Sequence, residues 1–425
     1  MAKTSYKIEN GEFYINDSLT YSEILHGNPQ VRGLLFNARF INGVFDDINP
    51  DHVGKYDRFG RKFDRDRNTE DLIKALPAWY EAGLRAITVG LQAGGPIYTY
   101  EDWGGICTNA FSTDGRSLNK DTWDRLVRIL KAADELGMLV IVSFFYQAQI
   151  QYLENDGSIL EASKTACQAL RELEYDNVII EIANEYNILD AHVKDTALIK
   201  GKNMAAWIRK VREWTDGRFA VGSSAGGIYA DKEVILASDI SLVHGNTARR
   251  QELHDFVRRI RSWKPEQPVV VNEDSPLFTH LEVAVEDHFS WGYYNNMTKQ
   301  EPPCDWGITR GEDEYFAQRL SGLIGISRPD MENEVYLQGF EPEMTIAGGR
   351  YVRAACRRPE LIDRVRFYED DTLLDVAYAE PFMLYSEATW IQEPYFPSRG
   401  AAAFRAEVVM LDGQVEILRQ NLKDL

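Results

Sequence analysis

Short apolar segments of strand length alternate with amphipathic helical segments along most of this 425-residue chain. The apolar segments are nearly continuous rather than alternating, as expected for strands that are buried on both faces of a parallel sheet. In the helical segments apolar residues recur every three or four positions, as Trp123, Leu126, Leu130 and Ala133 do. The pattern predicts an α/β fold in which each strand is followed by a helix.

The pattern gives eight strands, each followed by a helix, which is the count of a (β/α)8 TIM barrel. The predicted strands are Gly33–Ala38, Ala86–Gln92, Leu139–Tyr146, Val178–Asn184, Ala220–Ser224, Ser241–Gly245, Val269–Asn272 and Gly292–Asn295. The predicted helices are Glu70–Ala82, Thr122–Leu136, Ser158–Leu173, Gly201–Trp214, Lys232–Leu236, Gln251–Trp263, Leu281–Ser290 and Glu314–Gly325.

The two ends of the chain do not show the alternation of strands and helices and instead contain short strand candidates separated by turns. Tyr6–Ile15 indicates a β-hairpin with a turn at Asn10-Gly11, which we expect to plug the bottom of the barrel. After about Asn333, short strand candidates are separated by turn signals such as Asp412-Gly413, which is typical of a small β-sandwich. We therefore predict an N-terminal hairpin extension (1–30), a barrel (31–330) and a C-terminal β-sandwich (331–425). The C-terminal module could bind carbohydrate, but a structural brace packed on the barrel is the commoner role for such a module.

Composition narrows the class of protein. A hydrophobic content of 44% and a charged content of 27% are ordinary for a soluble globular protein. The net charge of -19 argues against a nucleic-acid partner, because phosphate contacts need a basic face. Four widely spread cysteines, Cys107, Cys167, Cys304 and Cys356, form no CxxC pair and no metal spacing, so we expect free thiols.

The sequence carries no sign of membrane attachment or of a bound cofactor. The first residues lack the apolar core of a signal peptide, and no apolar run approaches the roughly 20 residues that cross a bilayer. These features predict a cytoplasmic protein without a membrane partner, although a chain whose secretion signal had been removed would look the same. The P-loop and dinucleotide-binding glycine motifs are absent, so no cofactor is expected.

Two of the predicted strands end in carboxylates. The apolar run Val178–Ala183 leads into Asn184-Glu185, and Pro268–Val271 leads into Asn272-Glu273. The C-terminal ends of barrel strands meet at one mouth, where active sites of such barrels lie. A pair of carboxylates there predicts an acid/base residue and a nucleophile.

These motifs resemble those of the clan A retaining glycoside hydrolases, a group of barrels that includes the family 5 cellulases. Its members carry Asn-Glu after strand four and Glu after strand seven, and the resemblance covers the predicted barrel. It implies that Glu185 is the general acid/base, that Glu273 is the nucleophile, and that their carboxyl groups lie about 5–5.5 Å apart. It also implies that Asn184 hydrogen-bonds the sugar 2-hydroxyl. The alternative is that both glutamates are surface residues just past strands.

Other strand ends offer supporting residues. Members of the clan often place an arginine after strand two, but Ile87–Gln92 has none; Arg39, at the end of strand one, could instead hold the nucleophile ionised. A simple pairing of Arg39 with acids at the rim is equally open. His244 follows strand six, where the resemblance implies a residue facing the sugar or the nucleophile; a structural histidine is the alternative.

Aromatic and amide side chains complete the list of candidates. The resemblance implies that Trp291 and Tyr293, beside strand eight, form a platform for the apolar face of the sugar, although aromatic residues are also common in cores. Gln92 and Tyr146 could hydrogen-bond sugar hydroxyls. Asp274, next to the nucleophile, is expected to support its neighbours or to cap a helix.

Two long loops follow strands one and two, Phe40–Asn68 and Ala93–Asp121. Long loops at this face usually carry function, and the second is rich in aromatic residues (Tyr98, Tyr100, Trp103 and Phe111). Such walls favour a closed pocket, and hence exo-action or short oligosaccharide substrates. The alternative is that the loops only brace the rim of the barrel or form an oligomer contact. The arginines of the first loop stand among aspartates, which predicts internal ion pairs rather than binding of an acidic sugar.

The sequence therefore predicts a glycoside hydrolase that cleaves β-linked glycosides by a retaining mechanism. A transglycosylase would carry the same residues, and a non-catalytic carbohydrate-binding barrel is a further alternative. A metal-dependent barrel enzyme of the enolase type needs acidic ligands at the ends of consecutive strands, whereas Phe144–Gln147 and Ser223–Gly226 offer none, so no metal is expected. The sugar, the linkage and the oligomeric state stay open.

Overall fold

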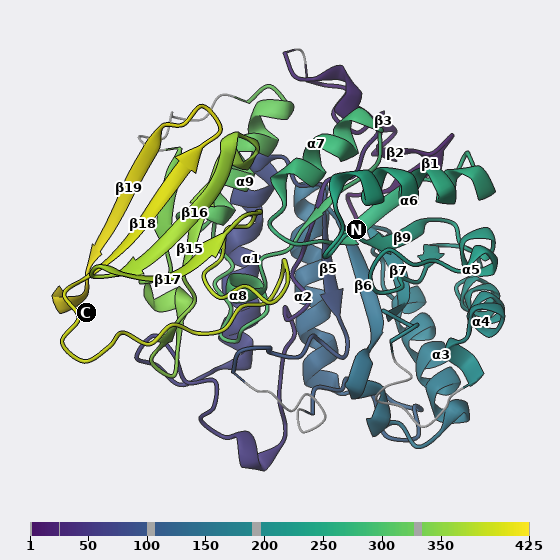
Figure 1. Ribbon diagram of the computed structural model, residues 1–425. Helices are drawn as coiled ribbons and strands as arrows, with labels where there is room; N and C mark the ends of the chain where they lie inside the picture. Colours follow the sequence, from purple (N-terminus) through teal and green to yellow (C-terminus); the bar gives the residue numbers. More distant parts are fainter. Residues whose placement is uncertain (1, 25, 100–106, 189–196, 327–333, 425) are drawn as a thin grey trace.

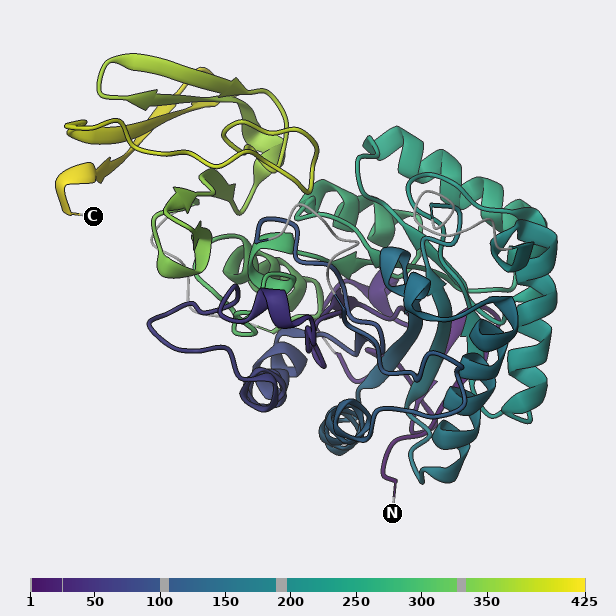
Figure 2. The same cartoon turned by 90° about the horizontal axis from the view of Figure 1, so that it is seen from below.

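The computed structural model describes residues 2–24, 26–99, 107–188, 197–326 and 334–424, without the side chains of residues 147 and 148. Figures 1 and 2 show a large lobe of strands and helices beside a smaller lobe built of C-terminal strands. The predicted boundary at residue 330 lies outside the described residues.

All eight predicted strands of the large lobe form, and they are parallel. They are β4 (Asn37–Arg39), β5 (Ala86–Gly90), β6 (Leu139–Tyr146), β7 (Val178–Asn184), β8 (Ala220–Gly222), β9 (Ser241–His244), β10 (Val269–Glu273) and β11 (Gly292–Tyr293). Six of them pair in the order β11-β4-β5-β6-β7-β8, and β9 pairs with β10.

Backbone hydrogen bonds link the two sheets on one side. The Val271 N–H donates to the Ser290 carbonyl at 2.9 Å, and the Ser290 N–H donates to the Val269 carbonyl at 3.0 Å, just before β11. Within the described ranges no strand ladder joins β8 to β9. The mixed α/β fold with a parallel sheet is confirmed, and closure of all eight strands into one barrel stays a prediction.

Helices follow the strands and cover the outside of the sheet, as α3, α4 and α5 do in Figure 1. The helix after β4 begins earlier than predicted because Asp64 caps it, accepting the Arg67 N–H. The helices are α1 (Arg65–Ala82), α2 (Lys120–Leu136), α3 (Asp156–Glu172), α4 (Gly201–Trp214), α5 (Lys232–Ala237), α6 (Arg250–Trp263), α7 (Phe278–Glu286), α8 (Asn296–Lys299) and α9 (Glu312–Leu323).

The N-terminal hairpin packs against the beginnings of the parallel strands. Strands β1 (Tyr6–Glu9) and β2 (Glu12–Ile15) join at Asn10-Gly11, both with positive φ, and β3 (Ser18–Leu19) follows. Phe13 is fully buried in a cluster with side chains of β5, β6 and β7. The Tyr6 hydroxyl donates to the Val178 carbonyl and accepts the Ala220 N–H. The hairpin therefore closes the end of the sheet opposite the strand C-termini.

The small lobe consists of antiparallel strands. Its main sheet has the order β17-β16-β18-β19, and β12 pairs with β15. Buried apolar residues of β12 and β15 share one cluster with those of β16 and β18, so the two sheets pack around a common core. The strands are β12 (Val335–Gln338), β13 (Thr345–Ile346), β14 (Gly349–Arg350), β15 (Arg353–Cys356), β16 (Ile362–Glu369), β17 (Thr372–Ala377), β18 (Ala403–Met410) and β19 (Val415–Asn421).

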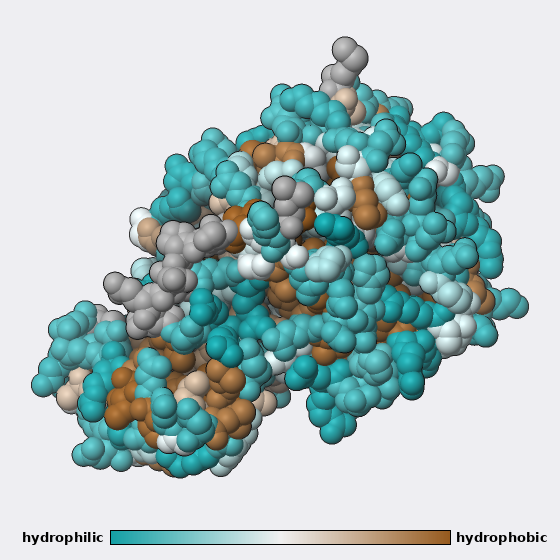
Figure 3. Space-filling model, turned by 90° about the horizontal axis from the view of Figure 1, so that it is seen from above, coloured by the Kyte–Doolittle hydropathy of each residue, from teal (hydrophilic) through white to brown (hydrophobic). Residues whose placement is uncertain are grey.

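The surface of the molecule, its cysteines and its helices can be compared with what the sequence predicted. Figure 3 shows hydrophilic side chains over most of the face that it presents. All four cysteines are free, as predicted. No helix among the described residues combines the length and the apolar character needed to cross a membrane.

Candidate active site

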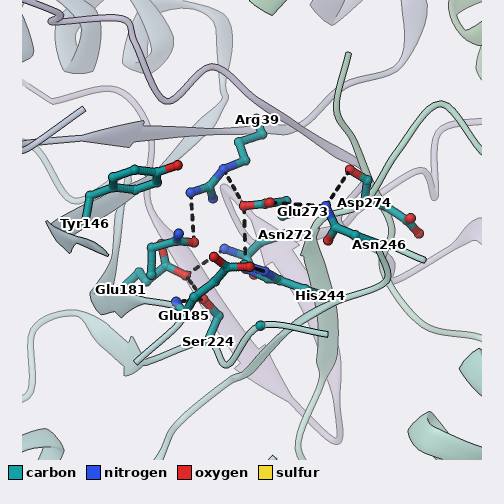
Figure 4. A network of polar contacts seen from close by, with 12 residues as sticks. Arg39, Tyr146, Glu181, Glu185, Ser224, His244, Asn246, Asn272, Glu273 and Asp274 are labelled. Carbon is teal, nitrogen blue, oxygen red and sulfur yellow. Dashed lines mark hydrogen bonds and ion pairs between the residues drawn. The ribbon is translucent and has the colours of Figure 1, made fainter. Parts of the chain in front are cut away.

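The two carboxylates predicted from the strand ends come together. Glu273 is the last residue of β10, and Glu185 immediately follows β7. His244 ends β9 and lies between them (Figure 4). One oxygen of each glutamate and one ring nitrogen of His244 all lie within 4.8 Å of one another. Three strand ends thus build one cluster of ionisable groups.

Glu273 is buried and held by a cation. The Arg39 Nε lies 2.7 Å from its Oε2, and Asn246 donates to its Oε1 at 3.2 Å. Burial raises the pKa of the Glu273 carboxyl, whereas the Arg39 guanidinium and His244 favour the ionised form and oppose that rise. This carboxylate is therefore fixed in position by two neighbours from different strand ends.

Arg39 connects the C-terminal ends of β7 and β10, because it contacts both Asn184 and Glu273. It is buried at the end of β4, and its Nη2 donates to the Asn184 Oδ1 at 2.9 Å. Its guanidinium also lies over the Tyr294 ring, 5.6 Å from the centroid. The structure thus places Arg39, at the end of β4, against Glu273 and Asn184.

Glu185 has an unusual backbone. Its φ is +53°, in the left-handed region that residues other than glycine rarely adopt. Its carboxylate lies 3.2 Å from the His244 Nδ1. A Cβ at Gly226 would lie 2.8 Å from the Glu185 Oε1, so the glycine leaves room for this carboxylate. The strained turn directs the side chain toward the cluster, and such strain is typical of functional sites.

His244 contacts both carboxylates. Its Nδ1 lies 3.2 Å from Glu185, and its Nε2 lies 3.7 Å from Glu273. Burial favours the neutral ring, but the two carboxylates outweigh that effect and raise the pKa of His244. A protonated His244 would offset part of the negative charge that the two glutamates bring together.

A layer of polar residues beneath the cluster supports it. Glu181, in β7, accepts hydrogen bonds from Asn272 at 2.8 Å and from Ser224 at 2.7 Å. Asp274 accepts from His280 at 2.8 Å and from the Trp291 indole at 2.7 Å, in line with the supporting role expected of it. Glu181 is not among the residues predicted from the sequence, although a carboxylate inside the apolar run Val178–Ala183 is a visible signal.

The aromatic platform predicted beside strand eight does not form. Trp291 and Tyr293 are both fully buried in the main core. The Trp291 indole is bonded to Asp274, and Tyr293 donates to Asp313 and stacks on Phe316 with 4.3 Å between ring centroids. The structure corrects this prediction, because both rings point into the protein rather than toward the carboxylates.

Gln92 is a brace rather than part of the cavity wall. It is fully buried, donates to Asn109 and to the Gln149 carbonyl, and accepts the Tyr146 N–H at 3.0 Å. Its hydrogen-bonding groups hold the chain around the end of β6. Tyr146 itself lines the cavity. A hydrogen bond from Tyr146 to a sugar hydroxyl stays a prediction.

A cavity of about 300 Å³ opens beside the two carboxylates. Its polar wall includes Asn246, Thr247, Asn296 and Gln300, and its apolar wall includes Ile97, Ile188 and Trp390. Trp390 comes from the C-terminal lobe. From the sequence, the role of this lobe stayed open between carbohydrate binding and a structural brace, and Trp390 was not among the predicted site residues.

A larger cavity, of about 650 Å³, lies near the N-terminal hairpin at the other end of the strands. The basic side chains of its wall are bonded internally: Arg212 to Asp239, Arg218 to Asp176, and Lys264 to the Ser238 carbonyl. We place the candidate active site in the smaller cavity because it contains the paired carboxylates.

The two long loops are tied into the protein. Tyr98 packs on Tyr351 and Phe111 on Phe145, whereas Tyr100 and Trp103 lie outside the described residues. In the first loop Arg61 pairs with Asp71, and Arg65 pairs with Asp46 and Asp121, as the interleaved charges predicted.

Glu301 holds the start of the second loop. Its carboxylate accepts the N–H groups of Ile97, Tyr98 and Thr99 and the Thr99 hydroxyl. Three backbone bonds to one buried side chain fix Ile97 where it lines the cavity.

The spacing of Glu185, His244 and Glu273 would also suit a metal ion. However, the Arg39 guanidinium sits 2.7 Å from Glu273, a fixed positive charge where a cation would have to bind. The geometry therefore favours chemistry by the carboxylates themselves.

No protein-family model and no curated protein matches this chain. Among solved structures, a protein from Bacteroides vulgatus assigned to the glycoside hydrolases aligns with 96% of this chain and 83% of its own, at 9% identity and a TM-score of 0.51. A GH5-4 broad specificity endoglucanase from an uncultured bacterium aligns at 11% identity over 72% of this chain and 98% of its own, with a TM-score of 0.47.

A Bacteroides fragilis protein assigned as a beta-galactosidase aligns with 98% of this chain at 11% identity and a TM-score of 0.44, and the present chain spans only 57% of its length. At such low identities a likeness concerns the fold alone. The likeness to the Bacteroides vulgatus protein shows that this chain shares the fold of a protein assigned to the glycoside hydrolases.

Proposed function

We propose that this protein is a retaining glycoside hydrolase of the (β/α)8 type that cleaves β-linked glycosides. The observation that carries the proposal is the short distance between the carboxylates: oxygens of Glu185 and Glu273 lie within 4.8 Å. Retaining enzymes keep their two carboxyl groups about 5–5.5 Å apart, whereas inverting enzymes leave about 6.5–9.5 Å for a water molecule.

Glu273 is the nucleophile in this proposal. Its carboxylate attacks the anomeric carbon, and the bond from that carbon to the leaving oxygen breaks while Glu185 gives that oxygen a proton. Arg39, 2.7 Å from Glu273, favours the ionised form that the attack needs. In this proposal Asn184, which accepts a hydrogen bond from Arg39, bonds the sugar 2-hydroxyl.

The second step regenerates the enzyme. Glu185, now a carboxylate, takes a proton from water as the water oxygen attacks the anomeric carbon. The ester bond to Glu273 breaks, and its electron pair returns to the Glu273 carboxylate. Two inversions leave the product with the configuration of the substrate.

Hydrogen-bonding capacity around the carboxylates suits a sugar. Among the described residues, the buried Arg39 Nη1, His244 Nε2 and Asn246 Oδ1 have no hydrogen-bond partner. Buried polar atoms in proteins are normally paired, so these three atoms are candidates for bonds to hydroxyl groups or to water.

The size of the cavity favours a short substrate. About 300 Å³ is the lower end of the range for ligand pockets. We therefore propose exo-action or cleavage of short oligosaccharides. A polymer would have to pass along an open groove instead.

The test of the mechanism is the stereochemistry of the product. The chain is incubated with a panel of nitrophenyl β-glycosides, and proton NMR follows the first sugar released before mutarotation. The β-anomer is expected first; first release of the α-anomer would overturn the retaining mechanism. Hydrolysis of none of the panel, at high enzyme concentration, would count against a glycosidase.

Product size tests the exo-action separately. Mono- or disaccharide should appear from the first minutes, with the viscosity of a β-linked polymer unchanged. An early fall in viscosity with a ladder of mixed oligomers would show an open cleft.

A further inference from the structure

We propose that Trp390, carried by the C-terminal lobe, is the aromatic wall against which the sugar ring packs at the Glu185–Glu273 pair. This inference rests on the proposed function and adds to it a binding residue from outside the α/β lobe. The C-terminal lobe would then be part of the substrate site.

Trp390 stands on a short hairpin of the C-terminal lobe, residues 386–392. The N–H groups of Glu387 and Ala388 donate to the Ile391 carbonyl at 3.1 and 3.2 Å, and Ser386 bridges to Gln392. The buried Gln392 side chain donates to the Val352 carbonyl at 3.0 Å. The hairpin is therefore closed by its own bonds and anchored in its lobe.

The residue before Trp390 ties the hairpin to the loops that follow β9 and β10. The Thr389 Oγ1 accepts the Thr247 N–H at 3.0 Å and lies 2.8 Å from the Ser275 Oγ. Thr247 follows Asn246, which bonds Glu273, and Ser275 lies two residues beyond Glu273. The tip of the hairpin is thus fixed relative to Glu273.

The loop after β5 holds the tip from another side. The Tyr98 hydroxyl donates to the Trp390 carbonyl at 3.2 Å. The N–H of Tyr98 is in turn held by Glu301. Three loops at the C-terminal ends of the strands therefore contact the hairpin, and Trp390 lines the cavity that contains the two carboxylates.

The chemistry of the cavity assigns a role to this indole. Its described wall combines polar side chains with the aliphatic Ile97 and Ile188, and Trp390 and Tyr146 are its aromatic members. A pyranose ring presents C–H groups on one face, which pack favourably on an aromatic surface. Trp291 and Tyr293 are buried in the core and cannot supply that surface.

The first test compares three variants of the full chain. W390A should lower kcat/KM on the nitrophenyl glycoside that wild type hydrolyses by about tenfold or more, mainly by raising KM. W390F keeps a ring and should retain most of the activity. Y378A removes an exposed aromatic of the same lobe and should behave as wild type. An unchanged kcat/KM in W390A would overturn the inference.

A binding measurement separates this inference from the proposed function. Saturation-transfer NMR follows the ring C–H protons of the same glycosides with E273Q and with E273Q/W390A, neither of which needs to turn over substrate. Transfer seen with E273Q and lost in the double variant supports the stacking role. Equal transfer in both, or none to any glycoside with E273Q, overturns it, whatever the hydrolysis assay shows.

Discussion

Glu273 and Glu185 share one cavity, but the chain holds them in different ways. Glu273 ends a regular strand, is buried, and has Arg39 at 2.7 Å and Asn246 at 3.2 Å. Glu185 lies just past its strand at a φ of +53°. Its carboxylate lies beside Gly226, and its Oε1 is 3.2 Å from the His244 Nδ1. A nucleophile needs a fixed position and a stable charge, whereas an acid/base must gain and lose a proton in each cycle.

The largest loss of turnover is expected from substitution of Glu273. E273Q keeps the shape of the side chain but removes the proposed nucleophile, so turnover should fall by about 10⁴-fold or more. Initial rates on a nitrophenyl glycoside measure it, with E416Q on the exposed face of β19 as the matched control. A loss of less than tenfold would show that Glu273 is not the nucleophile.

Glu185 should behave differently, in a way that depends on the leaving group. E185A should slow substrates with poor leaving groups by about 10²–10⁴-fold, and activated aryl glycosides far less in the first step, because those need no protonation. Added azide should restore turnover and give a β-glycosyl azide. The same loss on all leaving groups, without rescue by azide, would contradict the assignment of Glu185 as the acid/base.

Arg39 provides the test of the charge difference. Its guanidinium favours the ionised form of Glu273, so R39M should raise the pKa of that carboxyl. The acidic limb of the kcat/KM profile should therefore move to higher pH, with activity lost first at low pH. R61M, which removes a partly exposed cation, is the control. A limb that stays in place would show that Arg39 does not set the charge of Glu273.

The smallest effect is expected at Asn246. N246A removes one hydrogen bond to Glu273 and leaves the ion pair with Arg39, so kcat should fall by about 3–10-fold. The steady-state rate at the optimal pH measures it. A loss as large as that of E273Q would mean that Asn246 has a more direct part in the chemistry.

The strand ends were predictable because they depend on local pattern. An apolar run followed by Asn184-Glu185, and a second one followed by Glu273, are enough to place both carboxylates at the C-terminal ends of parallel strands. Arg39 follows from the same pattern, as the last residue of β4.

The remaining parts of the site depend on information that local pattern lacks. β11 has only two residues, so alternation could not decide which side of it Trp291 and Tyr293 would face. Trp390 reaches the cavity through contacts between residues more than 100 positions apart, such as Thr247 with Thr389. Spacing along the chain carries no signal for such a contact, nor for the pairing of Glu181 with Asn272 across two strands.

The position of the Thr389–Trp390 tip has a consequence for the order in which the candidate site is assembled. Domains generally fold as units and in the order of synthesis, so the parallel strands with both glutamates can assemble before the C-terminal lobe is made. The cavity acquires its Trp390 wall only when that lobe has folded and Thr389 has met Thr247 and Ser275. On this order of folding, the wall formed by Trp390 is the last part of the cavity to be added.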